Sequence, residues 1–371
     1  MKAVTEWYVI RNVEEIDSPA LLIYKDRVKN NIDTLIKTID HAGRLRPHIK
    51  THKSAEITQV MMQAGIKKFK CATIAEAEML ANTGAPDILL AYQPVGPKAA
   101  RLAELAESFS KVKFSCLIDN FSSASHLANV FSTIHSNIAV YIDLNVGMNR
   151  TGIVPESASA LFEQCHALKG LTVIGLHAYD GHLRDADYEV RKKRCDDAFA
   201  RVQKLKTDID QKFKTDLLIV AGGTPTYSIH CKRKEIECSP GTFVYWDKGY
   251  DAGLPEQQYK FAALVLSRVI SKPSENMICV DLGHKAIASE NPLNNRVYFL
   301  NAGELEPVGH SEEHMVFKTD GKKNYHVGDV LYGVPHHICP TVALHDQAYV
   351  IEKQHFTDYW YNISRNRKIT I

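Results

Sequence analysis

The sequence predicts an α/β protein, a (β/α)8 TIM-type barrel with a C-terminal antiparallel β domain. Strand-like and helix-like segments alternate between residues 20 and 224 with about eight strands, which is typical of parallel strands joined by crossover helices. After about residue 240, short strand-like runs are separated by Gly, Pro, Asn and Asp, as in antiparallel sheets. We therefore expect the barrel at residues 17–240 and the β domain at 241–371, with about residues 1–16 added to the β domain.

The predicted elements follow in chain order. Ala20–Tyr24 is an apolar run of strand length, and residues 26–39 carry apolar side chains at helical spacing. Further barrel strands are expected at 46–53, 69–72, 87–92, 114–118, 138–146, 172–177 and 217–221, and further helices at 55–64, 75–82, 99–108, 155–168 and 188–213. The β domain is expected to contain strands at 261–267, 277–281, 296–300, 314–317, 327–332 and 348–351.

Composition excludes several classes of protein. The net charge of +2 gives no reason to expect nucleic acid or an anionic membrane as a partner. The first residues lack the apolar core of a signal peptide, and charged residues interrupt every apolar window before membrane-spanning length. The eight cysteines show no paired spacing, so we expect reduced thiols in a cytoplasmic protein.

Residues 46–53, Arg-Pro-His-Ile-Lys-Thr-His-Lys, form the most unusual stretch, because five basic side chains occur without one acid. If the stretch is a strand, His48, Lys50 and His52 share one face. A lysine among other cations at the end of a barrel strand holds its proton less tightly and is a better nucleophile for Schiff-base chemistry. The alternative is a basic surface strand that binds nothing.

The predicted strand 217–221 runs into Gly222-Gly223-Thr224-Pro225-Thr226. Barrels of this kind often bind phosphate after the seventh and eighth strands, and two glycines allow the backbone to approach an anion closely while threonine hydroxyls donate hydrogen bonds. A plain turn is the alternative explanation. No Gly-x-Gly-x-x-Gly or Walker sequence occurs, which disfavours a nucleotide-binding fold.

Polar residues also follow the strand at 172–177, where His177, Tyr179 and His182 occur within six residues. Tyr179 could stack against a flat cofactor ring, and His177 or His182 could transfer protons near neutral pH. A buried, hydrogen-bonded histidine is the alternative for either position.

The β domain contains Pro335-His336-His337-Ile338-Cys339-Pro340. On a strand, His337 and Cys339 share a face, and an imidazole with a thiolate is a suitable pair of zinc ligands. Two ligands would leave coordination positions for water or substrate, as a catalytic metal requires. The alternative is a cysteine that only packs in the core.

Four motifs together resemble the D-threonine aldolase and D-serine dehydratase family of alanine-racemase-like, fold-type III pyridoxal-phosphate enzymes. They are Arg46-Pro47-His48-x-Lys50-Thr51-His52-Lys53, Cys71-Ala72-Thr73-x-x-Glu76-Ala77-Glu78, Gly222-Gly223-Thr224-Pro225-Thr226 and His337-x-Cys339-Pro340-Thr341. The resemblance extends from about residue 17 to 350. It implies a homodimer with an active site at the boundary between the barrel and the β domain.

The resemblance also implies roles for individual residues. Lys50 would carry the pyridoxal phosphate, and His337 and Cys339 would hold a divalent metal, zinc or manganese. Arg150 matches the position near the phenolic oxygen of the cofactor, and Tyr179 matches the position that packs on its ring. The remaining cofactor-binding residues expected from the resemblance are His48, Gly222, Gly223, Thr224, Gly241 and Thr242.

The sequence departs from the racemases at two positions. Their arginine against the pyridine nitrogen corresponds to Cys238-Ser239-Pro240-Gly241 here, and their second catalytic base, a tyrosine, has no match near residues 280–285. We therefore do not expect two-base racemisation. His177 also stands where the aldolases often carry glutamine, which leaves the substrate open.

The predicted function is a metal-assisted lyase that acts on D-configured β-hydroxy-α-amino acids. As an aldolase, a base, either His182 or His177, would remove the hydroxyl proton and the Cα–Cβ bond would break. As a dehydratase, Lys50 would take the α-proton while the metal helps hydroxide to leave. The third alternative, a non-enzymatic pyridoxal-phosphate carrier, would need neither the metal pair nor the β domain.

Overall fold

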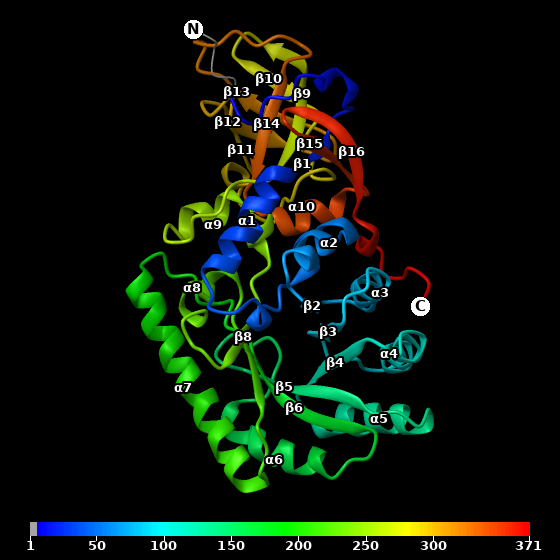
Figure 1. Ribbon diagram of the computed structural model, residues 1–371. Helices are drawn as coiled ribbons and strands as arrows, with labels where there is room; N and C mark the ends of the chain where they lie inside the picture. Colours follow the sequence, from blue (N-terminus) through cyan, green and yellow to red (C-terminus); the bar gives the residue numbers. More distant parts are fainter. Residues whose placement is uncertain (1–5) are drawn as a thin grey trace.

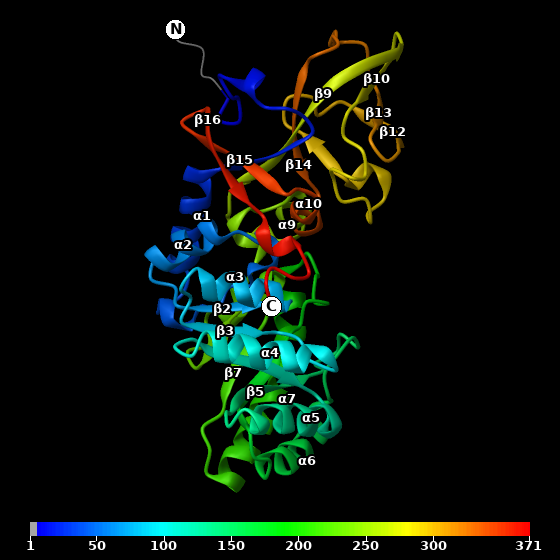
Figure 2. The same cartoon turned by 90° about the vertical axis from the view of Figure 1, so that its right-hand side faces the viewer.

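The computed structural model describes residues 6–371, which form two β-sheets (Figure 1). A parallel sheet of seven strands and its helices form the lower part of the molecule in this view, and a mixed sheet of nine strands forms the upper part. Figure 2 shows that the C-terminal residues return from the upper part to the helices of the lower part. None of the helices within residues 6–371 is long and apolar enough to cross a membrane.

The seven parallel strands are neighbours in sequence order, from β2 to β8. They are β2 (Lys68–Cys71), β3 (Asp87–Leu90), β4 (Lys113–Ile118), β5 (Ile138–Leu144), β6 (Leu171–Ala178), β7 (Leu218–Ala221) and β8 (Ile236–Cys238). The helices between and before them are α2 (Ala55–Gln63), α3 (Ile74–Asn82), α4 (Pro97–Ser108), α5 (Phe121–Thr133), α6 (Pro155–His166), α7 (Tyr188–Phe213) and α8 (Tyr227–His230). This alternation confirms the predicted barrel architecture.

Residues 45–48 close the barrel between β8 and β2. Leu45 forms a parallel bridge with Cys238, and His48 forms one with Lys70. The backbone N–H of Arg46 donates to the carbonyl of Cys238 at 2.9 Å, and that of Lys70 donates to the carbonyl of Pro47 at 2.8 Å. The eighth strand position is therefore filled by a segment too short and irregular to be a regular strand.

One predicted barrel strand belongs to the other sheet, and one barrel strand was not predicted. β1 (Ala20–Tyr24) pairs antiparallel with β9 and parallel with β15 in the mixed sheet, so it is not a barrel strand. Its five side chains are all buried. Such an apolar run occurs in a parallel barrel sheet and also in an antiparallel sheet that is covered on both faces, so the run alone does not identify the sheet. β8 was missed because it is only three residues long and follows the charged residues 232–235.

The predicted strand 46–53 is also wrong beyond His48, because Ile49–Thr51 forms the 3-10 helix η3. The Nδ1 atom of His48 accepts a hydrogen bond from the backbone N–H of Lys50 at 3.3 Å and so caps this turn. Lys53 then has a φ of 53°. His48, Lys50 and His52 consequently do not share the face of a strand.

The mixed sheet is mostly antiparallel, as predicted, and the long strand β9 (Ala263–Ser274) pairs with β1, β10 and β14. The other strands are β10 (Met277–Val280), β11 (Val297–Phe299), β12 (Glu306–His310), β13 (Met315–Lys318), β14 (Val330–Pro335), β15 (Gln347–Glu352) and β16 (His355–Tyr361). The helices α1 (Lys25–Lys37), α9 (Lys248–Gly253) and α10 (Ile338–Leu344) lie between this sheet and the barrel (Figure 1).

Part of the predicted N-terminal contribution to the β domain can be described. Tyr8, Ile10 and Ile16 are buried in one cluster with side chains of β1, β9 and β14. Residues 1–5 lie outside the described part of the chain. The domain limits of 17–240 and 241–371 remain a prediction.

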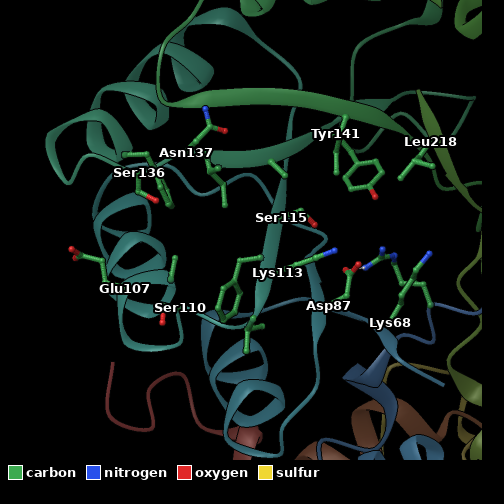
Figure 3. Close-up of a pocket in the computed structure, with 18 of the residues that line it drawn as sticks. Lys68, Asp87, Glu107, Ser110, Lys113, Ser115, Ser136, Asn137, Tyr141 and Leu218 are labelled. Carbon is green, nitrogen blue, oxygen red and sulfur yellow. Dashed lines mark hydrogen bonds and ion pairs between the residues drawn. The ribbon is translucent and has the colours of Figure 1, made fainter. Parts of the chain in front are cut away.

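The N-terminal end of the barrel is held by buried ion pairs rather than by apolar packing alone. Arg46, 2% exposed, donates to Glu237 and to Asp87 at 2.6 Å each, and Lys68 pairs with Glu237 at 2.5 Å. A cavity of about 680 Å³ opens here, lined by the first residues of β2, β3 and β4 (Figure 3). Since catalytic groups of such barrels gather at the opposite, C-terminal ends of the strands, we interpret these ion pairs as structural.

Candidate active site

Lys50 lies at the C-terminal end of the barrel in η3, where three parts of the chain meet. Its neighbour Thr51 has its Oγ1 atom 3.1 Å from the Sγ atom of Cys339 in α10. A Cβ atom added to Gly241, which follows β8, would lie 2.9 Å from the carbonyl oxygen of His48. No described residue pairs with the Lys50 amine, so the amine is available to react.

The predicted phosphate loop joins the ends of β7 and β8. The Oγ1 atom of Thr224 accepts hydrogen bonds from the backbone N–H groups of Gly241, at 3.2 Å, and Thr242, at 3.1 Å. Gly222 has a φ of +75°, a conformation that favours glycine, and a Cβ atom there would lie 2.7 Å from the ring of His230. The structure thus brings both predicted glycine-threonine segments together beside the Lys50 turn.

Tyr179 presents its ring next to this loop. A Cβ atom on Gly223 would lie 2.7 Å from the Tyr179 ring, so the ring packs directly on the loop backbone. The guanidinium group of Arg150 lies 5.1 Å from the ring centroid. Arg150 is exposed, and no described residue forms an ion pair with it, which leaves it able to bind an anion.

His177 is fully engaged in hydrogen bonds inside the barrel. Its Nδ1 atom lies 2.7 Å from the Oδ1 atom of Asp143, and its Nε2 atom lies 3.5 Å from the Nζ atom of Lys70. Gln93 donates to the other carboxylate oxygen of Asp143 at 3.0 Å. Burial lowers the pKa of His177 although the Asp143 hydrogen bond opposes this, so the imidazole is neutral at neutral pH.

His182 differs from His177 in having an unsatisfied nitrogen. Its Nδ1 atom is buried and has no hydrogen-bond partner among the described residues. A Cβ atom added to Gly147 would lie 2.8 Å from the Nε2 atom of His182, so the His182 ring packs on the loop after β5. Burial lowers the pKa of His182, which favours the neutral imidazole that can accept a proton.

His337 and Cys339 are close together, although not on a strand as predicted. β14 ends at Pro335, His337 is the N-cap of α10, and Cys339 lies in the first turn of that helix. The signals for this change are Pro335, at which the strand ends, and Pro340, because proline is tolerated in the first turn of a helix. In the helix the two side chains remain close enough to influence each other, since Cys339 raises the pKa of His337 and His337 lowers that of Cys339.

The thiol of this pair is suited to a metal, whereas the imidazole would have to lose a proton to bind one. Burial would raise the pKa of Cys339, but the His337 hydrogen bond and the charge of Lys50 outweigh it and lower that pKa. Burial opposes the charge on His337, yet Cys339 and Glu290 raise its pKa to about 9. The Nδ1 atom of His337 lies 2.5 Å from Oε1 of Glu290, the carboxylate–histidine arrangement that orients metal-binding imidazoles.

A second cluster, made of Asp180, Cys195 and His230, was not predicted. All three side chains are buried, and their ligand atoms lie within 4.8 Å of one another. His230 Nε2 lies 2.8 Å from Asp180 Oδ2 and 3.3 Å from Cys195 Sγ, and Arg233 donates to both His230 and Cys195. The guanidinium charge of Arg233 disfavours a cation here, so we interpret the cluster as a hydrogen-bond network behind the phosphate loop.

The site residues fit a cofactor that combines a phosphate, an aromatic ring and an aldehyde. The loop after β7 suits the phosphate, the Tyr179 ring suits the aromatic ring, and the Lys50 amine suits the aldehyde. In addition, the Oγ atom of Ser239 is buried at the end of β8 and has no partner among the described residues. An unsatisfied buried hydroxyl is costly, and it is available to a polar ligand atom.

Three residues of the site were missed in the sequence. Lys70 had a detectable signal, because a lysine in the middle of a short barrel strand is unusual. Asp143 is the last but one residue of β5, close to the strand end where barrel enzymes gather polar residues, but no role was assigned to it. Glu290 gave no signal in the sequence, because it lies in a loop 47 residues before His337.

Comparisons with known proteins identify the fold and the family. Residues 23–248 match the family described as "Alanine racemase, N-terminal domain", and residues 262–351 match the "Putative serine dehydratase domain". The chain is 27% identical to a D-threonine aldolase from Arthrobacter sp over 93% of this chain and 92% of that protein. It is 23% identical to the D-serine dehydratase of Dictyostelium discoideum over 92% and 94%.

The solved structure of D-threonine aldolase from Filomicrobium marinum has the same fold. It superimposes with a TM-score of 0.86 at 24% identity, over 95% of this chain and 96% of that chain. The first family match covers more than half of the present chain and includes Lys50, Tyr179, Gly222 and Thr242. The chain therefore belongs to the alanine-racemase-like family of pyridoxal-phosphate enzymes, and it is a lyase of the group that includes D-threonine aldolase and D-serine dehydratase.

Proposed function

We propose that this protein is a pyridoxal-phosphate- and metal-dependent lyase that cleaves D-β-hydroxy-α-amino acids into glycine and an aldehyde. The observation that carries the proposal is the contact between the Lys50 turn and the metal pair. Thr51, next to Lys50, has its hydroxyl 3.1 Å from Cys339, and the charge of Lys50 lowers the pKa of the Cys339 thiol. The lysine proposed to bind the cofactor is thus adjacent to the residues proposed to hold the metal.

Each part of the proposed cofactor has residues that would hold it. Lys50 would bind it covalently, the segment with Gly222, Gly223 and Thr224 and the segment with Gly241 and Thr242 would surround the phosphate, and His48, Tyr179 and Arg150 would enclose the ring. When bound, pyridoxal phosphate supplies an electron sink for the bond that breaks at Cα. Tyr179 would restrict movement of the cofactor ring, because the Tyr179 side chain itself packs against Gly223.

A divalent metal, zinc or manganese, would be held by His337 and Cys339, and it would supply Lewis-acid polarisation of the β-hydroxyl. Glu290 keeps the proton on Nδ1 of His337, so that Nε2 is left for a ligand. Within residues 6–371, no third His, Cys, Asp or Glu completes a three-ligand group with this pair. Open positions for substrate and water would therefore remain.

The proton acceptor for the β-hydroxyl is proposed to be His182 rather than His177. His177 already uses both nitrogens, one with Asp143 and one with Lys70. His182 has a buried nitrogen without a partner among the described residues, and burial keeps it neutral by lowering its pKa. A neutral imidazole with an unused nitrogen can accept a proton and later return it.

The second candidate is a dehydratase that releases a 2-oxo acid and ammonia, since the β domain matches the putative serine dehydratase domain. The deciding experiment gives the purified, cofactor-loaded protein D-threonine and D-serine separately. Glycine plus an aldehyde would support the aldolase, and 2-oxobutyrate or pyruvate plus ammonia would support the dehydratase. Neither set of products from either substrate would contradict the proposed function.

Racemisation is expected to be negligible. Pro240 and Gly241 stand in the region where racemases carry an arginine, and residues 280–285 contain no tyrosine to act as a second base. Incubation with D- or L-alanine should therefore leave the enantiomer unchanged, as chiral chromatography would measure. Steady inversion at a rate comparable with the lyase reaction would contradict this expectation.

The proposed partners and location follow the family resemblance and the composition. The expected partner is a small D-amino acid, with no nucleic acid and no membrane. We also propose a homodimer in the cytoplasm, because the resemblance implies a dimer and the cysteines in residues 6–371 form no disulfide. Size-exclusion chromatography with light scattering would test the dimer.

A further inference from the structure

A buried carboxylate, Asp180, connects the end of β6 to the proposed phosphate loop, residues 222–226, and the proposed function does not use it. Asp180 is 4% exposed. Its Oδ1 atom accepts the hydroxyl hydrogen of Thr226 at 2.6 Å, and its Oδ2 atom lies 2.8 Å from the Nε2 atom of His230. Hydrogen bonds to a charged group are among the stronger ones in proteins, so this connection restrains the last residue of the loop.

Thr226 transmits the connection to the backbone of the loop. Its Oγ1 atom accepts a hydrogen bond from the backbone N–H of Gly223 at 3.4 Å. Because the hydroxyl hydrogen of Thr226 points to Asp180, the lone pairs of Oγ1 are left to face Gly223. The Tyr179 ring packs on the same glycine. Two consecutive residues after β6 therefore restrain Gly223, Tyr179 by packing and Asp180 through Thr226.

The back of the loop has little room to move. A Cβ atom added to Gly222 would lie 2.7 Å from the ring of His230 and 3.0 Å from Oγ1 of Thr226. The backbone N–H of Gly222 donates to the carbonyl of Ala178 at 3.0 Å. The partners of Asp180 thus lie against the loop backbone itself, and a shift of either partner would change the conformation of the loop.

Arg233 determines which nitrogen of His230 carries a hydrogen. A guanidinium group can only donate, and Arg233 hydrogen-bonds to the Nδ1 atom of His230, so Nδ1 is the acceptor. The hydrogen on Nε2 is then donated to Asp180. Asp180 consequently receives one hydrogen on each oxygen. A carboxylate can accept both, whereas an amide has an acceptor at only one of the two positions.

We propose that Asp180 is a positioning residue for the cofactor: through Thr226 it holds the loop 222–226 in the conformation that receives the phosphate, and Arg233, by fixing the tautomer of His230, makes a carboxylate necessary at this position. The role concerns affinity for the cofactor rather than the chemical step, because the hydrogen bonds of Asp180 lead to the loop and not to Lys50. The inference rests on the proposed binding of pyridoxal phosphate at this loop.

The test measures the affinity for pyridoxal phosphate in Asp180→Asn and in Thr226→Val. The cofactor is removed and titrated back, with the absorbance of the bound cofactor as the readout, and turnover is measured at saturating cofactor. Each variant should raise the apparent dissociation constant at least about tenfold, the effect of losing a hydrogen bond to a charged group, while turnover at saturation changes little. Thr226→Val tests the same connection if Asp180→Asn fails to fold.

The two changes should not be additive. Asp180 and Thr226 act through one hydrogen bond, so the double variant should lose no more affinity than the weaker-binding single variant. Losses that simply multiply would overturn the route through Thr226.

A rescue variant tests the role of the tautomer. Arg233→Gln, made together with Asp180→Asn, replaces the donor at Nδ1 of His230 by an amide whose oxygen can accept a hydrogen from Nδ1. The Nε2 atom can then accept a hydrogen from the amide introduced at position 180, whose oxygen remains for Thr226. Affinity should rise above that of Asp180→Asn alone. No recovery would overturn the role of Arg233.

Asp210→Asn is the matched control. Asp210 also accepts a threonine hydroxyl, that of Thr215 at 2.8 Å, together with the backbone N–H of Leu217 at 3.0 Å. It lies before β7, whereas the phosphate loop follows β7, so this variant should leave the dissociation constant of the cofactor unchanged. An equal loss in Asp210→Asn would overturn the inference, because general destabilisation would then be responsible.

The outcomes distinguish this inference from the proposed function. Wild-type affinity in both Asp180→Asn and Thr226→Val would overturn the role of Asp180 and leave the cofactor assignment intact. No binding of pyridoxal phosphate by the wild type would overturn both the inference and the cofactor assignment.

Discussion

Lys50→Ala is expected to abolish turnover and the absorbance of the lysine-bound cofactor. The substitution removes the amine that would bind the cofactor and, in the dehydratase route, the base that takes the α-proton. Loss of one positioned proton-transfer group alone costs about 10²–10⁴-fold in rate, so activity should fall below detection in a standard assay. Steady-state assays and an absorbance spectrum of the purified variant would measure both effects.

The phosphate loop should survive this substitution. Thr224, Gly241 and Thr242 are connected to one another by hydrogen bonds that do not involve the Lys50 side chain. The variant should therefore still bind pyridoxal phosphate, but borohydride should no longer fix it to the protein. This retention separates loss of the nucleophile from general unfolding.

Borohydride reduction of the wild type identifies the lysine directly. Lys53 pairs with buried Glu76 at 2.5 Å, and Lys70 is held by His177, so of these three lysines only Lys50 is unpaired among the described residues. Peptide mapping should find the reduced cofactor on Lys50. Its recovery on Lys53 or Lys70 would contradict the assignment.

The barrel could be predicted because its evidence is spread over more than 200 residues. Alternating strands and helices leave many independent signals, and one misassigned strand does not change the architecture. β1 was counted in place of β8, yet the predicted number of strand positions still agreed with a barrel closed through residues 45–48. Which sheet a five-residue apolar run joins depends on tertiary contacts that its own sequence does not contain.

The site was predictable where chemistry is encoded in neighbouring residues. The loop 222–226 lies at a strand end, as expected, because its glycines and threonines are contiguous. The relation of Lys70 to His177, or of Glu290 to His337, joins residues 107 and 47 positions apart. Such pairs arise only when the barrel and the loops of the β domain are assembled, so one sequence gives no local pattern for them.

The conformation of residues 337–339 shows a different kind of limit. A strand and the start of a helix can both bring residues i and i+2 near one ligand, so the pairing of His337 with Cys339 was predicted from the wrong secondary structure. The helix start also gives Asp247 a role, since its carboxylate accepts the backbone N–H of Ile338 at 3.1 Å. Burial raises the pKa of Asp247 to about 6.

Removal of the metal is expected to stop turnover without releasing the cofactor. The proposed ligands, His337 and Cys339, lie on α10 of the β domain, whereas the phosphate loop lies at the ends of β7 and β8. Lewis-acid polarisation of a hydroxyl contributes several kcal/mol to a reaction of this kind, or about 10²–10⁴-fold in rate. After chelation, the absorbance change that D-serine induces in the bound cofactor should remain while product formation stops.

Cys339→Ala should reproduce the effect of chelation permanently, because the remaining imidazole is a single ligand. Zinc or manganese should restore activity to the chelated wild type and not to this variant, and elemental analysis should find less metal in the variant. Cys195→Ala is the matched control, since its thiol belongs to the Asp180–Cys195–His230 cluster, where Arg233 also donates to it. If Cys195→Ala lost the metal and Cys339→Ala kept it, the buried Asp180–Cys195–His230 cluster would be the metal site. Full activity of a protein shown by elemental analysis to be metal-free would contradict any role of a metal in the reaction.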